Sequence, residues 1–309
     1  RKLHAYNCGS LLRKYKKVCG RTPMKSREAK LLAEAAHEAA VREALTTPKP
    51  GLVDAEGSGC HNDMDCALFL KSARAIAPFW EAQARTGLEG TPPSAAMREL
   101  RAAGAAMERA MFAATDGINT HKGLIYLMSL LLYGAGYALS SRDRVSAADA
   151  AKAASLAVRG VVEKELLPLA EKRPARELSN GERLFVEYGI TGIRGEAAAA
   201  FPSVIGGGLP AMRRAAEAGA SENDAGLAAL LTIMTVCEDS NVIHRAGYDY
   251  WKNVYPPLVG AALAAFDPCR PDYLLLRELE AAFLPLRVSP GGAADLLSCT
   301  YFLNSLRKI

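Results

Sequence analysis

The 309-residue chain is poor in aromatic residues and has no paired cysteine motif. Aromatic side chains make up 7% of the sequence, so the core must be built mainly from Ala, Leu, Val and Ile. The 7 cysteines include no CxxC pair and show no regular spacing, which argues against a disulfide framework or a structural zinc site. The first residues lack the apolar segment of a signal peptide. We therefore expect a reducing, cytoplasmic setting.

Acidic residues are absent from the start of the chain. Residues 1–27 hold many Lys and Arg, the first acid is Glu28, and the net charge of the whole chain is +5. A basic segment can contact nucleic acid, but it is more often a solvated tail. We expect a basic, flexible leader over residues 1–27, one domain over residues 28–309, and no nucleic-acid partner.

Long hydrophobic runs and strand patterns are also scarce. The long uncharged apolar run at residues 124–139 is shorter than the roughly 20 residues that a membrane span needs, so we expect a buried central helix and no membrane partner. Alternating β-branched segments are nearly absent, and no fixed-period repeat is visible. The sequence predicts an all-α fold, a single multi-helix globular domain.

Helical periodicity covers most of the remaining sequence. The helix expected over residues 30–45 stops where Pro48 restricts Thr47, and Asp63 is a good N-cap candidate for the next helix. The other expected helices lie at 64–77, 94–115, 124–139, 146–169, 210–218 and 224–238, twice within 256–288, and at 293–309.

Carboxylates interrupt this helical pattern in two places. If a helix begins at Met64, Asp63 lies in irregular chain and can converge with Asp65 on one cation. Magnesium favours one or two carboxylates completed by water and substrate phosphates. A helix cap with a first-turn acid is the alternative. Glu238 and Asp239 follow a strongly apolar window, where a carboxylate is costly unless paired or metal-bound.

Cations and glycines form two candidate anion sites. The segment NTHKG at residues 119–123 precedes the most apolar helix, whose free N–H groups can bind an anion, although a routine capping turn is the alternative. The segment YGITGIRGE at residues 188–196 is neither a Walker A motif nor GxGxxG. Its Arg194 can clamp a phosphate or pair with Glu196. Acids in two places and anion sites in two others predict a metal–polyphosphate site.

In collinear order these segments resemble triphosphoribosyl-dephospho-CoA synthase, the ATP:dephospho-CoA triphosphoribosyltransferase of citrate lyase and malonate decarboxylase systems. The likeness covers about residues 30–309. Its motifs are TPKPGLVD at 47–54, His61 with DMD at 63–65, NTHKG at 119–123, YGITGIRGE at 188–196, the acid-Ser-Asn…Arg cluster at 239–245, and SPGGAADLL at 289–297. The chain departs from the family pattern at Cys60, Asn180, Ala200, Ser240 and Ala246.

The resemblance implies an all-helical enzyme with two substrates, ATP and 3'-dephospho-CoA. The 2'-hydroxyl of dephospho-CoA attacks C1 of the ATP ribose, adenine leaves, and the triphosphate stays on the transferred sugar. The product is the prosthetic-group precursor of an acyl carrier protein. The resemblance is also compatible with a functional link to the transferase that loads that carrier protein, and with a homo-oligomer.

The resemblance also implies roles for single residues. Asp54 or His61 is the expected base, with nothing in the sequence to separate them. The expected magnesium ligands are Asp63, Asp65, Glu238 and Asp239. The residues expected to bind ATP or its phosphates are Lys49, Gly51, Asn119, Thr120, His121, Lys122, Gly123, Arg194, Gly195, Glu196, Asn241 and Arg245.

Two other functions stay open at the level of sequence. One is a metal-dependent helical nucleotide phosphohydrolase, but the common helical class uses adjacent His-Asp dyads and no His-Asp pair occurs here. The other is a non-catalytic nucleotide-binding relative, which the substitutions at Asn180, Ala200 and Ala246 leave open.

Overall fold

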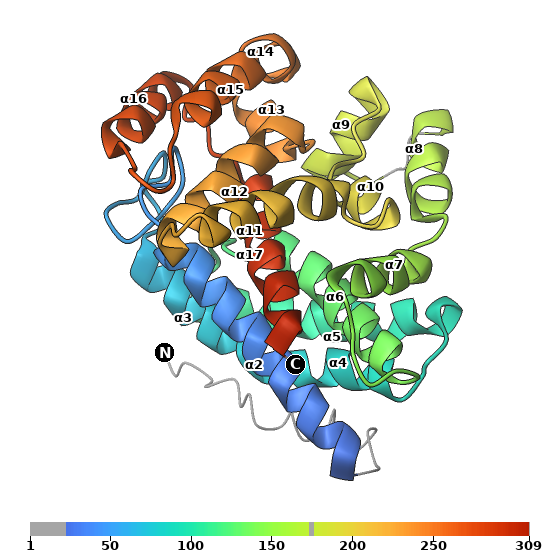
Figure 1. Cartoon of the computed structure of the whole chain (residues 1–309). Helices are drawn as coiled ribbons and strands as arrows, with labels where there is room; N and C mark the ends of the chain where they lie inside the picture. Colours follow the sequence, from blue (N-terminus) through green and yellow to red (C-terminus); the bar gives the residue numbers. More distant parts are fainter. Residues whose placement is uncertain (1–22, 173–175, 309) are drawn as a thin grey trace, which may run out of the picture.

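The computed structural model describes residues 23–172 and 176–308, and all its regular elements in these ranges are helices (Figure 1). The first half comprises α2 (Pro23–Leu45), α3 (Cys66–Ile76), η1 (Ala77–Phe79), α4 (Trp80–Leu88), α5 (Pro93–Ala114), α6 (Lys122–Leu139), α7 (Ala147–Ala157), η2 (Val162–Leu166) and α8 (Leu167–Glu171). The all-α prediction is confirmed.

The second half of the chain continues in the same way. It comprises α9 (Asn180–Tyr188), α10 (Gly192–Ala198), η3 (Ser203–Gly208), α11 (Leu209–Glu217), α12 (Glu222–Val236), α13 (Ser240–Ala246), α14 (Tyr248–Asn253), α15 (Tyr255–Ala265), α16 (Tyr273–Phe283), η4 (Leu284–Leu286), α17 (Gly291–Ser305) and η5 (Leu306–Lys308).

Helix α6 is the central buried helix that the apolar run predicts. It packs between α4 and α7, and glycines make the close approach possible. A Cβ at Gly134 would overlap the carbonyl of Ala150 in α7, and one at Gly136 would overlap the carbonyl of Ala84 in α4. By length and composition α6 could cross a membrane, and α12 with α13 passes that test only as a pair bent by 66°. Since 67% of the α6 window is buried inside the molecule, it is better explained as a core helix.

Helix α17 joins the two halves of the fold. It contacts α2 and α6 from the first half and α12 from the second, and Figure 1 shows it running between these groups of helices. Helix α17 therefore places its N-terminus beside the N-terminus of α6.

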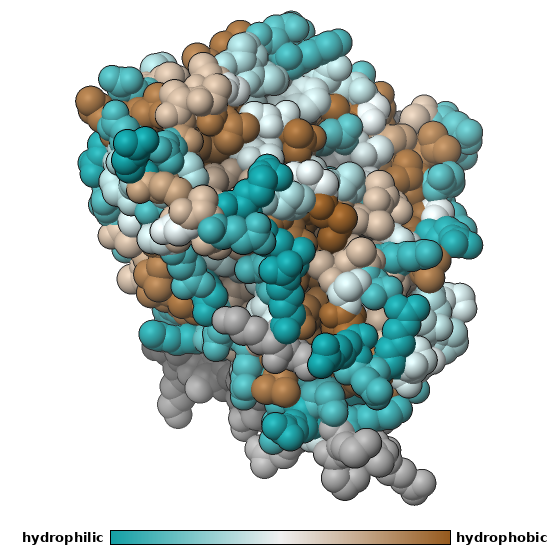
Figure 2. All heavy atoms as spheres, viewed as in Figure 1, coloured by the Kyte–Doolittle hydropathy of each residue, from teal (hydrophilic) through white to brown (hydrophobic). Residues whose placement is uncertain are grey.

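Hydrophilic residues cover much of the face of the molecule seen in Figure 2, with hydrophobic residues scattered between them.

Several helix boundaries differ from those expected. Helix α2 begins at Pro23, so the last five residues of the predicted leader are helical, while residues 1–22 lie outside the described part. The N-cap of α3 is Asp65 rather than Asp63, because the Asp65 side chain accepts a hydrogen bond from the Leu68 amide. A reciprocal capping box at Ser146 starts α7.

Two expected helices are interrupted. The helix expected over 146–169 breaks after Ala157, where Gly160 has φ +74°, a conformation outside the right-handed helix. The helix expected over 224–238 ends at Val236, and Asp239 then caps the separate helix α13. Helices α4, α9, α10 and α14 were not anticipated.

Candidate active site

A cavity of about 730 Å³ opens where the N-termini of several helices meet. Its walls come from helices throughout the chain, namely α2, α3, α5, α6, η2, α9, α10, α13 and α17, and from the segments around residues 52–64, 119–121, 179, 190–191 and 289. This volume lies within the roughly 300–1,000 Å³ typical of small-molecule sites. Helix N-termini carry free N–H groups, so the walls suit anionic ligands.

One wall of the cavity carries three cations and two acids. Lys122 Nζ lies 3.3 Å from Glu108 Oε2, and Arg194 Nε lies 3.8 Å from Glu165 Oε2. Arg101 also pairs with Glu165. These side chains are 31–56% exposed, so their ion pairs are worth little and can be exchanged for phosphate contacts.

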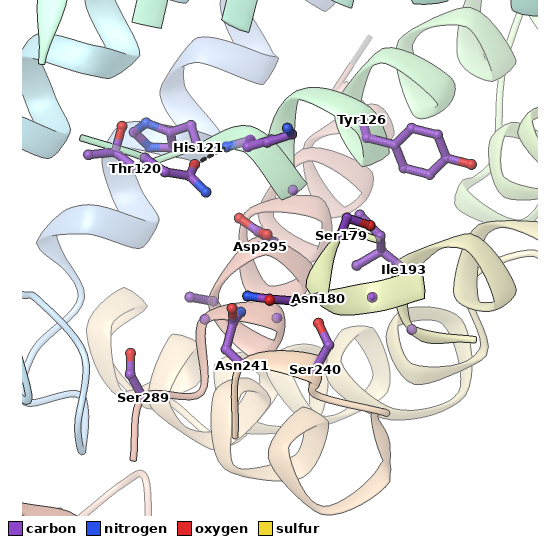
Figure 3. Close-up of a pocket in the computed structure, with 18 of the residues that line it drawn as sticks. Thr120, His121, Tyr126, Ser179, Asn180, Ile193, Ser240, Asn241, Ser289 and Asp295 are labelled. Atoms are coloured by element: carbon purple, nitrogen blue, oxygen red, sulfur yellow. Dashed lines mark hydrogen bonds between the residues drawn. The ribbon is translucent and has the colours of Figure 1, made fainter. Parts of the chain in front are cut away.

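The N-terminus of α6 forms an adjacent wall. The Asn119 side-chain oxygen accepts a hydrogen bond of 3.2 Å from the Lys122 amide. Thr120 Oγ1 donates a hydrogen bond to Ser72 Oγ, which lies 2.7 Å from His121 Nδ1. These contacts hold the side chains of Thr120 and His121 at one side of the cavity (Figure 3). Burial, and then the charge of Lys49, lower the pKa of His121 to about 3. His121 is therefore neutral at physiological pH.

The loop wall brings His61 together with two distant residues. Its Nε2 lies 2.8 Å from Ser289 Oγ, and its Nδ1 lies 3.4 Å from a guanidinium nitrogen of Arg245. Burial, followed by the nearby Arg245, lowers the pKa of His61, whereas Asp63 acts to raise it. The ring is therefore held mainly in its neutral form, which can accept a proton.

Small polar residues cover the opposite side of the cavity. Ser179 and Asn180 stand at the start of α9, and Ser240 and Asn241 at the start of α13 (Figure 3). Amide and hydroxyl groups of this kind can both donate and accept hydrogen bonds. They suit a neutral, hydrogen-bonding part of a ligand, such as a base or a ribose.

Many residues predicted to bind ATP or to act in catalysis line this one cavity. Their positions along the chain are far apart, so the fold gathers them. They are His61, Asn119, Thr120, His121, Lys122, Gly123, Arg194, Asn241 and Arg245.

The four predicted metal ligands do not line the cavity. Asp65 caps α3, and Asp239 caps α13 while also accepting a hydrogen bond from the Ala293 amide. Glu238 accepts from the backbone N–H groups at the start of α10, and Asp63 lies 3.7 Å from His61. Over residues 23–172 and 176–308, no group of three or more His, Cys, Asp or Glu side chains could hold a metal ion. The acids are therefore not gathered into one ligand set, because backbone amides engage three of them.

The remaining predicted residues also lie outside the lining. Asp54 accepts hydrogen bonds from the amides of Lys49, Glu56 and Gly57, so its carboxylate holds a turn together. Lys49 is 2% exposed and donates to the backbone and carboxylate of Glu43.

Three other predicted ligand-binding residues make contacts within the protein instead. A Cβ at Gly51 would overlap the carbonyl of Val288, and one at Gly195 would overlap the side chain of Thr191. The Glu196 carboxylate accepts hydrogen bonds from the backbone and side chain of Ser203.

Sequence reasoning missed several residues that line the cavity. Glu43 sits in an amphipathic helix and resembles an ordinary surface acid. Asp295 lies within the SPGGAADLL motif, to which no single role was assigned, and a carboxylate in such an apolar helix was a further signal. The other lining side chains not anticipated include Arg101, Glu108, Tyr126 and Glu165.

Comparison with known proteins identifies relatives along nearly the whole chain. A protein of Azotobacter vinelandii named "Probable 2-(5''-triphosphoribosyl)-3'-dephosphocoenzyme-A synthase" is 38% identical over 283 residues, which are 91% of this chain and 93% of the relative. A Vibrio cholerae protein of the same name is 34% identical over 285 residues, 91% of this chain and 89% of the relative.

A third relative, from Pectobacterium atrosepticum, is named "2-(5''-triphosphoribosyl)-3'-dephosphocoenzyme-A synthase". It is 35% identical over 266 residues, which are 84% of each chain. No solved structure matches the chain. The profile of the CitG family, described as ATP:dephospho-CoA triphosphoribosyl transferase, matches residues 29–309, and the chain therefore belongs to this family.

Proposed function

We propose that this chain transfers the 5-triphosphoribosyl group of ATP to the 2'-hydroxyl of 3'-dephospho-CoA and releases adenine. Membership of the CitG family carries the proposal, because the matched residues 29–309 include every residue that lines the cavity. The cavity supports it with cations for phosphates on one wall and neutral polar groups on another.

The triphosphate is proposed to bind at the cationic wall. Lys122 and the N-terminus of α6 lie there, and Arg101 and Arg194 lie on the neighbouring helices. A helix N-terminus and mobile cations are a common combination for phosphate binding. The partly exposed ion pairs to Glu108 and Glu165 can open when phosphate oxygens replace them.

Magnesium is proposed to enter with the triphosphate. Since magnesium takes one or two carboxylates and completes its shell with water and phosphate, it does not need a protein cage. Glu108 and Glu165 stand beside the cations of this wall and fit that requirement. When bound, the ion neutralises part of the triphosphate charge. Activity should therefore be lost with EDTA and recovered when magnesium is added.

His61 is the proposed base for the attacking 2'-hydroxyl. It lines the cavity and its pKa is lowered, whereas the carboxylate of Asp54 is occupied by three backbone amides. The displacement at C1 of the ribose needs the hydroxyl held close to that carbon. A neutral imidazole can take its proton as the new bond forms.

The biological setting is a further part of the proposal. The product is proposed to be the prosthetic-group precursor of an acyl carrier protein of the citrate lyase or malonate decarboxylase type, made in the cytoplasm. A transferase that loads the carrier protein would consume it.

Product analysis tests this function directly. Purified protein with magnesium, ATP and 3'-dephospho-CoA should form adenine and a product whose mass equals dephospho-CoA plus the triphosphoribosyl group. Release of phosphate without adenine would instead favour a nucleotide phosphohydrolase. ATP binding without either product would favour a non-catalytic relative.

A further inference from the structure

Four acidic residues line the cavity, and one of them differs from the others. Three have a cationic partner: Glu43 pairs with Lys49, Glu108 with Lys122, and Glu165 with Arg101 and Arg194. Within residues 23–172 and 176–308, Asp295 makes no ion pair. Among the four acids that line the cavity, Asp295 is therefore the one whose charged form is not stabilised by an ion pair.

Two helices fix the place of Asp295. It stands in the second turn of α17, and its side chain is held against the first turn of α6, where it accepts a hydrogen bond from the Leu124 amide. A Cβ at Gly123 would overlap the carboxylate, so only glycine at this position leaves room for it. Figure 3 shows Asp295 between the α6 residues and the polar residues Asn180 and Asn241.

The surroundings of Asp295 favour its protonated form. Burial, then the negative charges of Glu43 and Asp239, raise the pKa of Asp295 well above its ordinary value. The hydrogen bond from Leu124 acts in the opposite direction but is the smallest of these effects. Cys299, one turn further along α17, is itself buried and uncharged. These surroundings therefore favour the form of the carboxyl group that carries a proton, which it can give away.

The Asn241 side chain lies against the face of α17 that carries Asp295. A Cβ at Gly291 would lie 2.8 Å from the Asn241 side-chain nitrogen, so this amide rests on the first turn of α17. Gly291 and Asp295 are four residues apart and share one face of the helix. Asparagine amides pair with the N6 and N7 edge of adenine. A base bound by Asn241 would thus lie within reach of the Asp295 carboxyl.

We propose that Asp295 is the general acid that protonates adenine as it leaves the ribose, an inference that rests on the proposed transferase function. The bond between C1 of the ribose and N9 of adenine breaks, its electron pair stays on the base, and Asp295 gives its proton to a ring nitrogen. The 2'-oxygen of dephospho-CoA bonds to C1 and loses its proton to His61. The two side chains then exchange a proton with solvent before the next turnover.

Asp295→Asn tests this role, because Asn keeps the size of the side chain and an oxygen for the Leu124 amide but has no acidic proton. With ATP, kcat should fall by about 100-fold or more, while KM for ATP stays within about threefold. The alkaline limb of the kcat–pH profile should disappear. Asp224→Asn is the matched control, because Asp224 is also a buried acid but lies outside the cavity. Its carboxylate accepts a hydrogen bond from the Tyr273 hydroxyl. Its kcat should stay within about twofold of wild type.

A substrate whose leaving group needs no proton separates acid catalysis from a structural role. The 5-triphosphate of 4-nitrophenyl β-ribofuranoside releases nitrophenolate, so Asp295→Asn and wild type should use it at rates within a few-fold. If Asp295→Asn does not fold, Gly123→Ala provides the test, because it keeps the carboxyl and displaces it. It should lower kcat for ATP far more than for the nitrophenyl substrate.

The two levels of the proposal fail in different ways. Near-normal kcat of Asp295→Asn with ATP, or an equal loss with both substrates, would contradict the role of Asp295 alone. Wild-type protein that releases no adenine from ATP and dephospho-CoA would contradict the proposed function and this role together.

Discussion

Replacing Lys49 by methionine is expected to destabilise the fold rather than to weaken phosphate binding. Lys49 is 2% exposed and Glu43 is 4% exposed, and the ammonium donates to both the carboxylate and the backbone oxygen of Glu43. Removing one partner of a buried pair typically costs about 3–5 kcal/mol, because the other charge is left without compensation. In a protein of this size, each kcal/mol corresponds to roughly 2–4 °C in Tm.

Urea denaturation and thermal melting measure this effect. The loss of stability should grow as pH rises above about 5. Burial raises the pKa of the Glu43 carboxyl group, and the variant lacks Lys49, which lowers that pKa, so ionising Glu43 in the folded protein becomes costly. The double change Glu43→Leu with Lys49→Met should recover much of the stability, since a buried pair can be replaced by apolar groups. Arg142→Met is the control, because Arg142 forms an exposed pair with Asp149 and should change stability by less than about 1 kcal/mol.

One outcome would contradict a purely structural role of Lys49. If Lys49→Met melts within about 2 °C of wild type but binds ATP much more weakly, then Lys49 contacts phosphate and its position beside Glu43 has been misinterpreted.

Two further changes test the packing and the titration of the core. His121 has a pKa near 3 in the fold and near 6.5 when unfolded, so stability should fall as pH drops below 6.5, by at most about 1.4 kcal/mol per pH unit. His121→Asn, which can still accept from Ser72, should flatten that slope in denaturation curves, and an unchanged slope would refute the buried neutral ring. Gly134→Ala should cost about 1–3 kcal/mol through overlap with the Ala150 carbonyl. Gly104→Ala should be neutral or stabilising in the same melts, because its Cβ would make only an ordinary contact of 3.8 Å with the Ile125 side chain.

The secondary structure was largely predictable because it depends on local patterns. The apolar run at residues 124–139 predicted α6, and Asn119 to Gly123 lie at its N-terminus as expected. Interruptions were harder to predict. Gly160 breaks an otherwise helical segment, and Asp65 rather than Asp63 caps α3 because its side chain reaches the Leu68 amide.

The candidate site was only partly predictable because long-range packing assembles it. Local sequence identified His61 and Arg245 as candidate site residues, and the fold brings His61 Nδ1 to 3.4 Å from a guanidinium nitrogen of Arg245. Local sequence could not show that the Asp239 carboxylate would accept hydrogen bonds from the backbone amides at the start of α13. Nor could it show that Asp295, near the end of the chain, would enter the cavity when α17 packs against α6.

The central claim is that the glycosidic bond of ATP breaks while its triphosphate stays on the transferred sugar. Turnover of ATP labelled with ¹⁴C in adenine and ³²P in the γ-phosphate tests it in one measurement. We predict that ¹⁴C appears as free adenine and that an equal amount of ³²P appears in the dephospho-CoA product. Recovery of ³²P as inorganic phosphate, with ¹⁴C still bound to ribose, would contradict this account.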